Sequence, residues 1–247
     1  MKITIIRTIR PLAVLFITPL LFLSAAQSTL AQEHRITAIS IWKPKEGQEQ
    51  RFEAGYKQHL QWHKRNGDKR DWYGWYVISG TNFGQFVDAT FDHSWSEFDN
   101  PVNPAGDGED NSLHTDPFGD YLVAFKLSRI EEASATDTVG LQSKYTRLIT
   151  LQVTDPVAAR KIIGRLKEKY LADGVKNFQC FRVVDGGNLN QIIILIGVQH
   201  FSEFNKTENI QEDLAAEERL LKTNVVTVIN SELLGFRSDM SLLNSGN

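Results

Sequence analysis

The sequence contains a single cysteine, Cys180, in 247 residues. No disulfide can form within the chain, so the fold must depend on a hydrophobic core, for which this length is sufficient. No histidine lies near Cys180 in the sequence, and we expect a buried core thiol, not a nucleophile. A Gly-rich phosphate loop, a G-x-S-x-G motif and a paired-carboxylate signature are also missing, so no motif names a reaction.

Long hydrophobic runs are missing after residue 31. The apolar run before it, "PLAVLFITPLLFLSAA", follows a short basic stretch and precedes small residues, with cleavage sites after Ala26 and Ala31. This pattern is typical of a secretory signal peptide. Because the run has 16 residues and a membrane-spanning helix needs about 20, we expect no stable membrane anchor. We therefore predict that residues 1–31 are removed and that the protein is exported, to the periplasm or out of the cell.

Basic residues also do not outnumber acidic residues in this chain. The chain has 27 basic and 30 acidic residues, and the predicted signal peptide removes three basic residues and no acidic one. The net charge therefore moves from -3 to about -6 in the mature chain. Binding to nucleic-acid phosphates requires clustered lysine and arginine, so this balance argues against nucleic acid as a partner.

What the sequence does contain is an internal repeat. The segment "WYVISGTNFGQFVDATFDHSWSEFD" (75–99) is followed, 106 residues later and without a gap, by "FRVVDGGNLNQIIILIGVQHFSEFN" (181–205). Upstream, "ITAISIW" (36–42) matches "TRLITLQV" (146–153) at an offset of 110. At that same offset the apolar faces of two predicted helices coincide. The matched helix residues are Phe52, Tyr56 and Leu60 in the first copy and Ile162, Leu166 and Tyr170 in the second.

Each copy predicts the element order βαββαβ, which is the ferredoxin-like order. Such a unit has helices on one face of its sheet and leaves the other face uncovered, so two copies can bury each other's open face. The fold class is therefore predicted to be α+β, with two tandem ferredoxin-like units packed sheet to sheet as a pseudo-twofold α+β barrel. The predicted boundaries are a signal peptide at 1–31, unit one at 35–132, a linker at 133–143, unit two at 144–235 and a loose tail at 236–247.

The pattern F/W-x-V-x-x-G followed by S-E-F, found in both copies, together with the element order, resembles the dimeric α+β barrel superfamily. That superfamily includes antibiotic-biosynthesis monooxygenases, NIPSNAP-type proteins, haem-degrading monooxygenases and chlorite-dismutase-like haem proteins. The resemblance covers roughly residues 35–235 and implies a cofactor-independent, monooxygenase-like activity on a small molecule. Chlorite-dismutase-like proteins carry an axial histidine on a helix of the second unit. The predicted helices 156–172 and 203–222 contain no histidine, which argues against haem ligation of that type.

Strand alternation separates the helix side of each sheet from the barrel interior. We assign Ile39 and Ile41 to the helix side, so that their neighbours point inward; in the second copy, Thr150, Gln152 and Cys180 are assigned to the inward side. An interior lined by aromatic and polar groups suits a small-molecule ligand. Asp88 and Arg182 would either anchor such a ligand or form a structural ion pair. The predicted ligand-binding residues are Trp42, Trp72, Tyr76, Asp88, Thr90, Gln152 and Arg182.

His59 and His63 are separated by one helical turn, and two imidazoles in that arrangement can bind a divalent metal. "HLQWH" lacks the glutamate of the zincin motif, which excludes a metalloprotease of that kind. A surface or helix-packing role is the alternative, because third ligands such as His93 or His114 are not placed by the sequence. The Pro/Gly-rich segment 100–120 is predicted to be a long surface loop, and "DGEDNSLHTD" within it does not have EF-hand spacing.

These observations predict an exported α+β barrel that binds a small apolar or aromatic molecule without a cofactor. Two alternatives stay open: a non-enzymatic binding or stress-related protein whose interior is packed shut, and a haem or metal protein that uses His59 and His63. Whether the chain is an enzyme also stays open. Association of outer edge strands would give a homo-oligomer.

Overall fold

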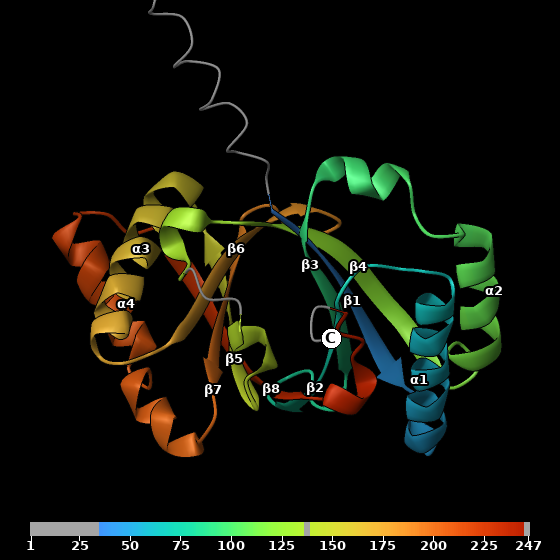
Figure 1. Ribbon diagram of the computed structural model, residues 1–247. Coiled ribbons are helices and arrows are strands. Elements are labelled where there is room, and N and C mark those ends of the chain that lie inside the picture. Colours follow the sequence, from blue (N-terminus) through green and yellow to red (C-terminus); the bar gives the residue numbers. More distant parts are fainter. Residues whose placement is uncertain (1–34, 136–138, 245–247) are drawn as a thin grey trace, which may run out of the picture. The chain divides into compact units, whose positions relative to one another are not determined.

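The computed structural model describes residues 35–135 and 139–244, which form one compact unit (Figure 1). The described chain contains eight strands and four α-helices. The strands are β1 (Ile36–Pro44), β2 (Trp72–Ser79), β3 (Phe86–His93), β4 (Gly119–Arg129), β5 (Tyr145–Val153), β6 (Asn177–Asp185), β7 (Gln191–Val198) and β8 (Val226–Phe236). The helices are α1 (Glu49–Arg65), α2 (Pro104–His114), α3 (Pro156–Ala172) and α4 (Ile210–Leu220).

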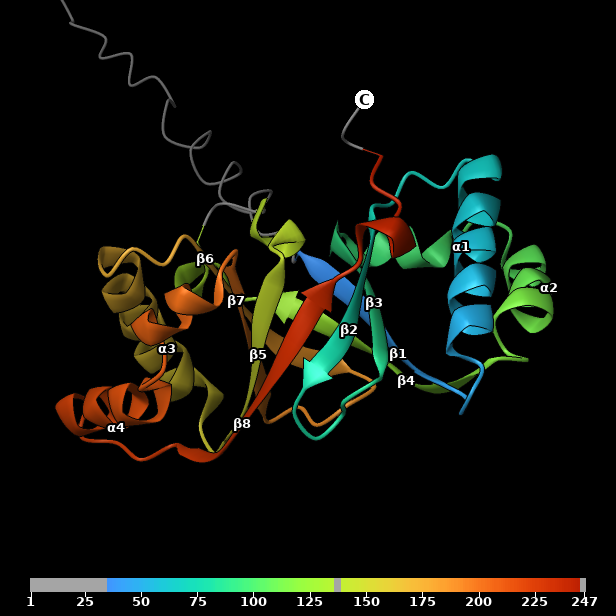
Figure 2. The same ribbon diagram turned by 90° about the horizontal axis from the view of Figure 1, so that it is seen from below.

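The eight strands form one closed antiparallel barrel, in the order β1-β3-β2-β8-β5-β7-β6-β4. The first four strands are adjacent in the order β4-β1-β3-β2, and the last four in the corresponding order β8-β5-β7-β6. Pairing of β2 with β8 and of β4 with β6 joins these two halves (Figure 2). The structure is therefore an α+β barrel.

The helices lie on the outside of the barrel, α1 and α2 against the first half and α3 and α4 against the second (Figures 1 and 2). The predicted apolar face of α1 is buried against β1 and β3, and that of α3 is buried against β5, β6 and β7. Both predicted helix faces are confirmed. Among the described residues no helix has the length and apolar character needed to span a lipid bilayer.

The predicted facing of the strands is wrong by one residue over most of the barrel. Ile39 belongs to the cluster of side chains inside the barrel, whereas Trp42 packs outside it, under α1. In the second half, Cys180 lies under α3 instead of facing inward. Both faces of these strands are buried, so hydrophobic alternation cannot identify the inner face, and an error of one residue reverses every side chain. Thr150 does face inward, as predicted.

The segment predicted to be a surface loop contains α2. Asn103 caps this helix, because its side-chain oxygen accepts a hydrogen bond from the backbone N–H of Gly106 at 3.2 Å, and Pro104 occupies the first turn. The Pro/Gly-rich composition of residues 100–120 concealed these capping signals. A short 3-10 helix at Trp95–Asp99 precedes α2 in the chain.

Residues 236–244, predicted to be a loose tail, are packed against the first half. Met240 is fully buried beside Phe52 and Phe86, and Leu242 exchanges two backbone hydrogen bonds with Trp72. The predicted linker at 133–143 has Ala133 and Leu141 buried at its two ends, and residues 136–138 within it lie outside the described residues. The predicted signal peptide also lies outside them.

Gly55 permits the close approach of α1 to α2. A Cβ atom at this position would lie 1.7 Å from the carbonyl oxygen of His114, at the end of α2. We expect Gly55→Ala to force the two helices apart and to lower the free energy of unfolding by about 1–3 kcal/mol, as overpacking does in other proteins. Urea denaturation measures this loss.

Gly164→Ala on α3 is the matched control, because the added Cβ would have its nearest neighbour at an ordinary 3.4 Å. The control should be neutral or stabilising by up to about 1 kcal/mol, since alanine favours helix over glycine. Equal effects of the two substitutions would show that α1 and α2 do not pack as described.

A candidate metal centre between α1 and α2

Two imidazoles and a carboxylate converge between α1 and α2. Nε2 of His59 and Nε2 of His63, one turn apart on α1, are 3.1 Å apart. Oδ1 of Asp107, from α2, lies 3.3 Å from the first nitrogen and 3.5 Å from the second. Both histidines are buried, whereas the Asp107 side chain is 38% exposed. The three atoms therefore form a nearly equilateral triangle, and the Asp107 side chain connects it to the protein surface.

These spacings suit one metal ion. Atoms that coordinate the same ion at about 2.1 Å, with angles of about 90–110°, are about 3.0–3.4 Å from one another. The three measured separations, 3.1, 3.3 and 3.5 Å, are close to that range. Among the described residues these three form the one group with this ligand geometry.

A second carboxylate orients His59. Its Nδ1 lies 2.9 Å from Oδ2 of Asp110, one turn after Asp107 on α2. A carboxylate accepts hydrogen bonds, so the Nδ1 proton points to Asp110 and the Nε2 lone pair is directed into the triangle. The side-chain amide of Asn111 lies 3.1 Å from the same Nε2. Rotation of this amide would present its oxygen as a fourth ligand.

Asp68 is the carboxylate next to His63, with its Oδ2 3.0 Å from Nδ1 of that ring, in a close polar contact. Asp68 also accepts hydrogen bonds from the Arg70 guanidinium and from Nε1 of Trp72. Burial raises the pKa of Asp68, but the hydrogen bonds from His63 and Arg70 outweigh burial and hold it well below its usual value. Asp68 is therefore anionic at neutral pH, and each imidazole has its own carboxylate partner.

The arrangement leaves three electron-pair donors facing one another. Burial, together with the neighbouring His63 ring, lowers the pKa of His59, so this imidazole is neutral at pH 7. Metal ions bind the neutral form of imidazole. Oδ1 of Asp107 is buried and has no hydrogen-bond partner. The amide of Asn111 lies 3.1 Å from Nε2 of His59, and a metal ion at the centre of the triangle would replace this donor and supply Asp107 Oδ1 with a partner.

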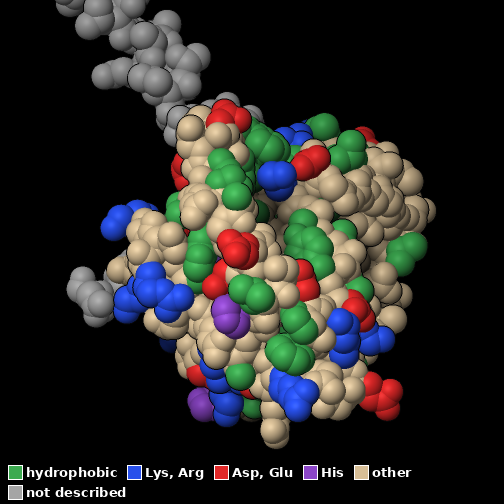
Figure 3. Space-filling view, turned by 90° about the vertical axis from the view of Figure 1, so that its right-hand side faces the viewer, with side chains coloured by type: hydrophobic (Ala, Val, Ile, Leu, Met, Phe, Trp, Pro, Cys, Tyr) green, Lys and Arg blue, Asp and Glu red, His purple; other side chains and the backbone are tan. Residues whose placement is uncertain are grey.

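Aromatic side chains fix the orientation of both rings. Trp62 stacks on His59 with the planes 9° apart, and Trp72 packs on His63 with centroids 4.3 Å apart. Figure 3 looks onto the face that carries α1 and α2, where acidic side chains reach the surface, whereas His59 and His63 are buried. The residues His93 and His114, considered as third ligands, lie elsewhere: His93 pairs with Glu97, and His114 contacts Asp110.

The predicted ligand-binding residues are not collected in one place. Trp42, Trp72 and Tyr76 pack under α1, outside the barrel. Thr90 pairs with Trp72 across the strands, on that same side. Gln152 shares the inward face of β5 with Thr150 and accepts a hydrogen bond from Asn188.

Asp88 and Arg182 do not form the structural ion pair that was one of the two alternatives for them. Asp88 is buried under α1 and accepts a hydrogen bond from Nε1 of Trp42 at 2.9 Å. Arg182 is half-buried on the face of β6 that also carries Cys180, in the other half of the barrel. An uncompensated buried carboxyl favours its neutral form, and burial raises the pKa of Asp88 to about 7.

This shift predicts a pH dependence of stability. Between the ordinary value of 3.8 and the native value of about 7, folded Asp88 keeps a proton that the unfolded chain has released. Stability therefore falls as the pH rises through this range, by up to roughly 4 kcal/mol. Asp88→Asn keeps an acceptor for Trp42 and has no charge to bury. Urea denaturation at pH 4.5 and pH 8 should show the variant gaining stability over the wild type with rising pH; parallel profiles would contradict this.

Three residues of the candidate centre were missed in the sequence: Asp107, Asp110 and Asn111. Their spacing of three and four residues places them on one face of a helix, which is a readable signal. This helical spacing was not recognised because residues 100–120 were interpreted as a loop. No sequence pattern identifies Asp68, which follows α1, as part of this site.

No protein-family model matches this sequence, and no curated protein matches it. Solved structures do resemble the fold. A "putative monooxygenase" from Lactobacillus acidophilus has a TM-score of 0.58 and 10% identity, over 86% of this chain and 97% of that one. A protein of the same description from Fusobacterium nucleatum has a TM-score of 0.56 and 9% identity, over 83% and 93%.

A variant of chlorite dismutase from Candidatus Nitrospira defluvii has a TM-score of 0.54 and 8% identity, over 86% of this chain and 96% of that one. Like these proteins, the chain folds as an α+β barrel. At these identities the likeness concerns the fold alone.

Proposed function

We propose that this protein binds a divalent first-row transition metal through His59, His63 and Asp107 and uses it to act on a small molecule. The observation that carries the proposal is the triangle of two imidazole nitrogens and one carboxylate oxygen, 3.1–3.5 Å on each side. Mixed nitrogen and oxygen ligands without a thiolate suit zinc, iron(II), manganese or cobalt. This proposal departs from the cofactor-free activity expected from the sequence.

The second half of the chain supports a cation at this place. Lys169 on α3 corresponds to His59 at the offset of 110 that aligns the buried helix faces, and Asp213 corresponds to Asp107, as the fourth residue of its helix. Nζ of Lys169 lies 3.3 Å from Asp213 and 3.3 Å from Asp173. The second half thus supplies its own cation between acidic groups, and a metal ion would take the same role in the first half.

This correspondence also supports descent of the two halves from one ferredoxin-like unit. Their strands have the same order, and the helices occupy equivalent positions outside the barrel. The proposed units retain the predicted boundaries 35–132 and 144–235. Residues 236–244 then belong structurally to the first unit, because Met240 and Leu242 complete its core.

The ligand set leaves coordination positions open, which catalytic metal sites require. Two histidines and one carboxylate with open positions are characteristic of non-haem iron(II) oxygenases, and zinc in the same set would activate a water molecule. The Lactobacillus and Fusobacterium proteins, described as monooxygenases, make oxygen-dependent oxidation the first reaction class to test. The exposed side of Asp107 is where a substrate would approach.

Export remains part of the proposal, supported by the N-terminal sequence pattern. N-terminal sequencing of the mature protein should give Gln27 or Gln32 as the first residue. An uncleaved N-terminus in the native host would contradict it.

Titration of metal-free protein tests the metal site. Zinc, manganese, cobalt or iron(II), the last under anaerobic conditions, should bind at one site per chain, and magnesium should not compete. At a concentration one hundred times Kd, the bound metal should stabilise the protein by about 2.7 kcal/mol and raise Tm by roughly 5–10 °C. Failure of all four metals to bind or stabilise the protein would refute the proposal.

A further inference from the structure

We propose that the barrel interior is a second binding site, which takes a small, neutral, apolar molecule. The interior holds a cavity of about 290 Å³. This volume is far larger than a packing defect and close to the lower end of natural ligand pockets. The walls are made by aliphatic side chains from both halves of the sheet: Ile39, Ile41, Val77, Val87, Leu148, Val183, Ile193 and Leu234.

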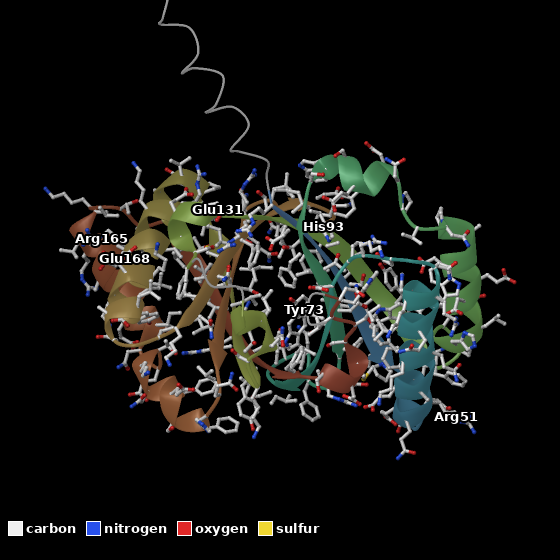
Figure 4. The ribbon with its side chains drawn as sticks, viewed as in Figure 1. Arg51, Tyr73, His93, Glu131, Arg165 and Glu168 are labelled. Atoms are coloured by element: carbon white, nitrogen blue, oxygen red, sulfur yellow. The ribbon has the colours of Figure 1, made fainter. Side chains whose placement is uncertain are left out.

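The interior is filled at one end and hollow at the other. Tyr73, Trp75, Phe91 and Phe181 contact one another with ring centroids 5.4–6.4 Å apart and fill the first end. Figure 4 labels Tyr73, which lies between the two halves of the barrel. Isoleucine, valine and leucine form most of the lining of the hollow end, together with Phe125 and Thr150. The cavity therefore lies where the interior side chains are mainly aliphatic.

Polar residues stand at the mouth, near the tips of two hairpins. Asn82 and Gln85 come from the β2–β3 hairpin, and Gly186, Gly187 and Gln191 from the β6–β7 hairpin. Gly186 lets its hairpin lie on β4, because a Cβ atom there would be 2.6 Å from the carbonyl oxygen of Ala124. Amide groups at the rim of an apolar pocket select a ligand whose polar end can form hydrogen bonds.

The charge at the mouth excludes anions. Glu232 is the single charged residue among those lining the cavity. Its carboxylate is held in place, since it accepts hydrogen bonds from the backbone N–H of Asn82 at 2.8 Å and from the side-chain amide at 3.2 Å. No lining lysine or arginine offsets it. A fatty acid or other carboxylate would meet a like charge, whereas an alcohol or phenol would not.

This site is independent of the candidate metal centre. The cavity residues of β1 and β3 point into the barrel, and the side chains packed under α1 point away from it. Failure of metal binding would leave this proposal unchanged. Failure of ligand binding in the cavity would likewise leave the proposed metal site unchanged.

Two probes with the same ring system test the proposal: 1-naphthol, which is neutral, and 1-naphthoate, which is anionic. Calorimetry should show that the full chain binds 1-naphthol and binds 1-naphthoate at least about tenfold more weakly. Ile193→Trp should fill the cavity and lower affinity for 1-naphthol at least about tenfold, whereas Ile193→Val should retain binding.

Glu232→Gln keeps an acceptor for Asn82 and removes the charge, so it provides a test that does not depend on the folding of the tryptophan variant. This substitution should raise affinity for 1-naphthoate about tenfold and leave 1-naphthol binding within about twofold. Absence of 1-naphthol binding, equal binding by Ile193→Trp, or no gain for 1-naphthoate in Glu232→Gln would each overturn the proposal.

Discussion

Replacing His59 or His63 by alanine should lower zinc affinity by at least about 100-fold, a larger loss than the 10–100-fold expected when a residue that only supports a ligand is replaced. Each imidazole supplies one of the three converging ligand atoms, and the two that remain cannot enclose an ion. Asp107→Asn should weaken binding as well, because the anionic ligand is lost. Calorimetric titration of the metal-free variants with zinc measures these changes.

Two controls separate a metal centre from general effects of histidine or helix substitution. Lys169→Ala changes the corresponding position on α3, and His200→Ala removes an exposed histidine of the second half. Both should bind zinc as the wild type does. Asp110→Asn should show the intermediate loss, since Asp110 touches His59 and is not itself a ligand. Affinity within threefold of the wild type for both His59→Ala and His63→Ala would exclude this site.

Phe86→Ala should lower the free energy of unfolding by about 3–5 kcal/mol. Phe86 is fully buried under α1, and its ring contacts the rings of Phe52, Tyr56 and Tyr76 at centroid distances of 4.6–5.7 Å. Its removal leaves a cavity between helix and sheet that the surrounding rings cannot fill without changing rotamer. Urea denaturation gives the value from the midpoint and slope.

Phe83→Ala is the control for this prediction. Phe83 lies at the tip of the β2–β3 hairpin with 73% of its surface exposed, so its loss should change stability by less than about 0.5 kcal/mol. Similar losses for the two phenylalanines would mean that the first-half core is not packed as described.

The element order and the helix packing were readable from the sequence because they depend on repeated local patterns. Phe52, Tyr56 and Leu60 recur at helical spacing, and their face is buried as predicted. The hairpins around Gly80 and Gly186 also form where the repeat predicts them, and both glycines have positive φ.

The inner face of the barrel was not readable, because both sides of strands β1, β3, β6 and β7 are largely buried. Ile39 and Trp42 are both large and apolar, and no local property shows which of them meets a helix. Which face of a strand points into the barrel is decided by strand pairing and by the docking of helices, and both bring together segments that are far apart in the chain. Asp88 illustrates this: its carboxyl is tolerated under α1 because Trp42 donates to it.

Two of the three ligands of the candidate metal centre were predicted. His59 and His63 lie on one helix, and their spacing alone brings them together. Asp107 comes from another helix more than forty residues away, and it reaches them because Gly55 lets α1 and α2 approach. Such a contact between two helices leaves no periodic signal in the sequence.

A crystal structure of the zinc-loaded protein, with anomalous data collected at the zinc edge, tests the central claim most directly. The account predicts one strong peak, within about 2.0–2.2 Å of Nε2 of His59, Nε2 of His63 and an Asp107 carboxylate oxygen. An empty triangle at saturating zinc, or a peak on other side chains alone, would contradict it.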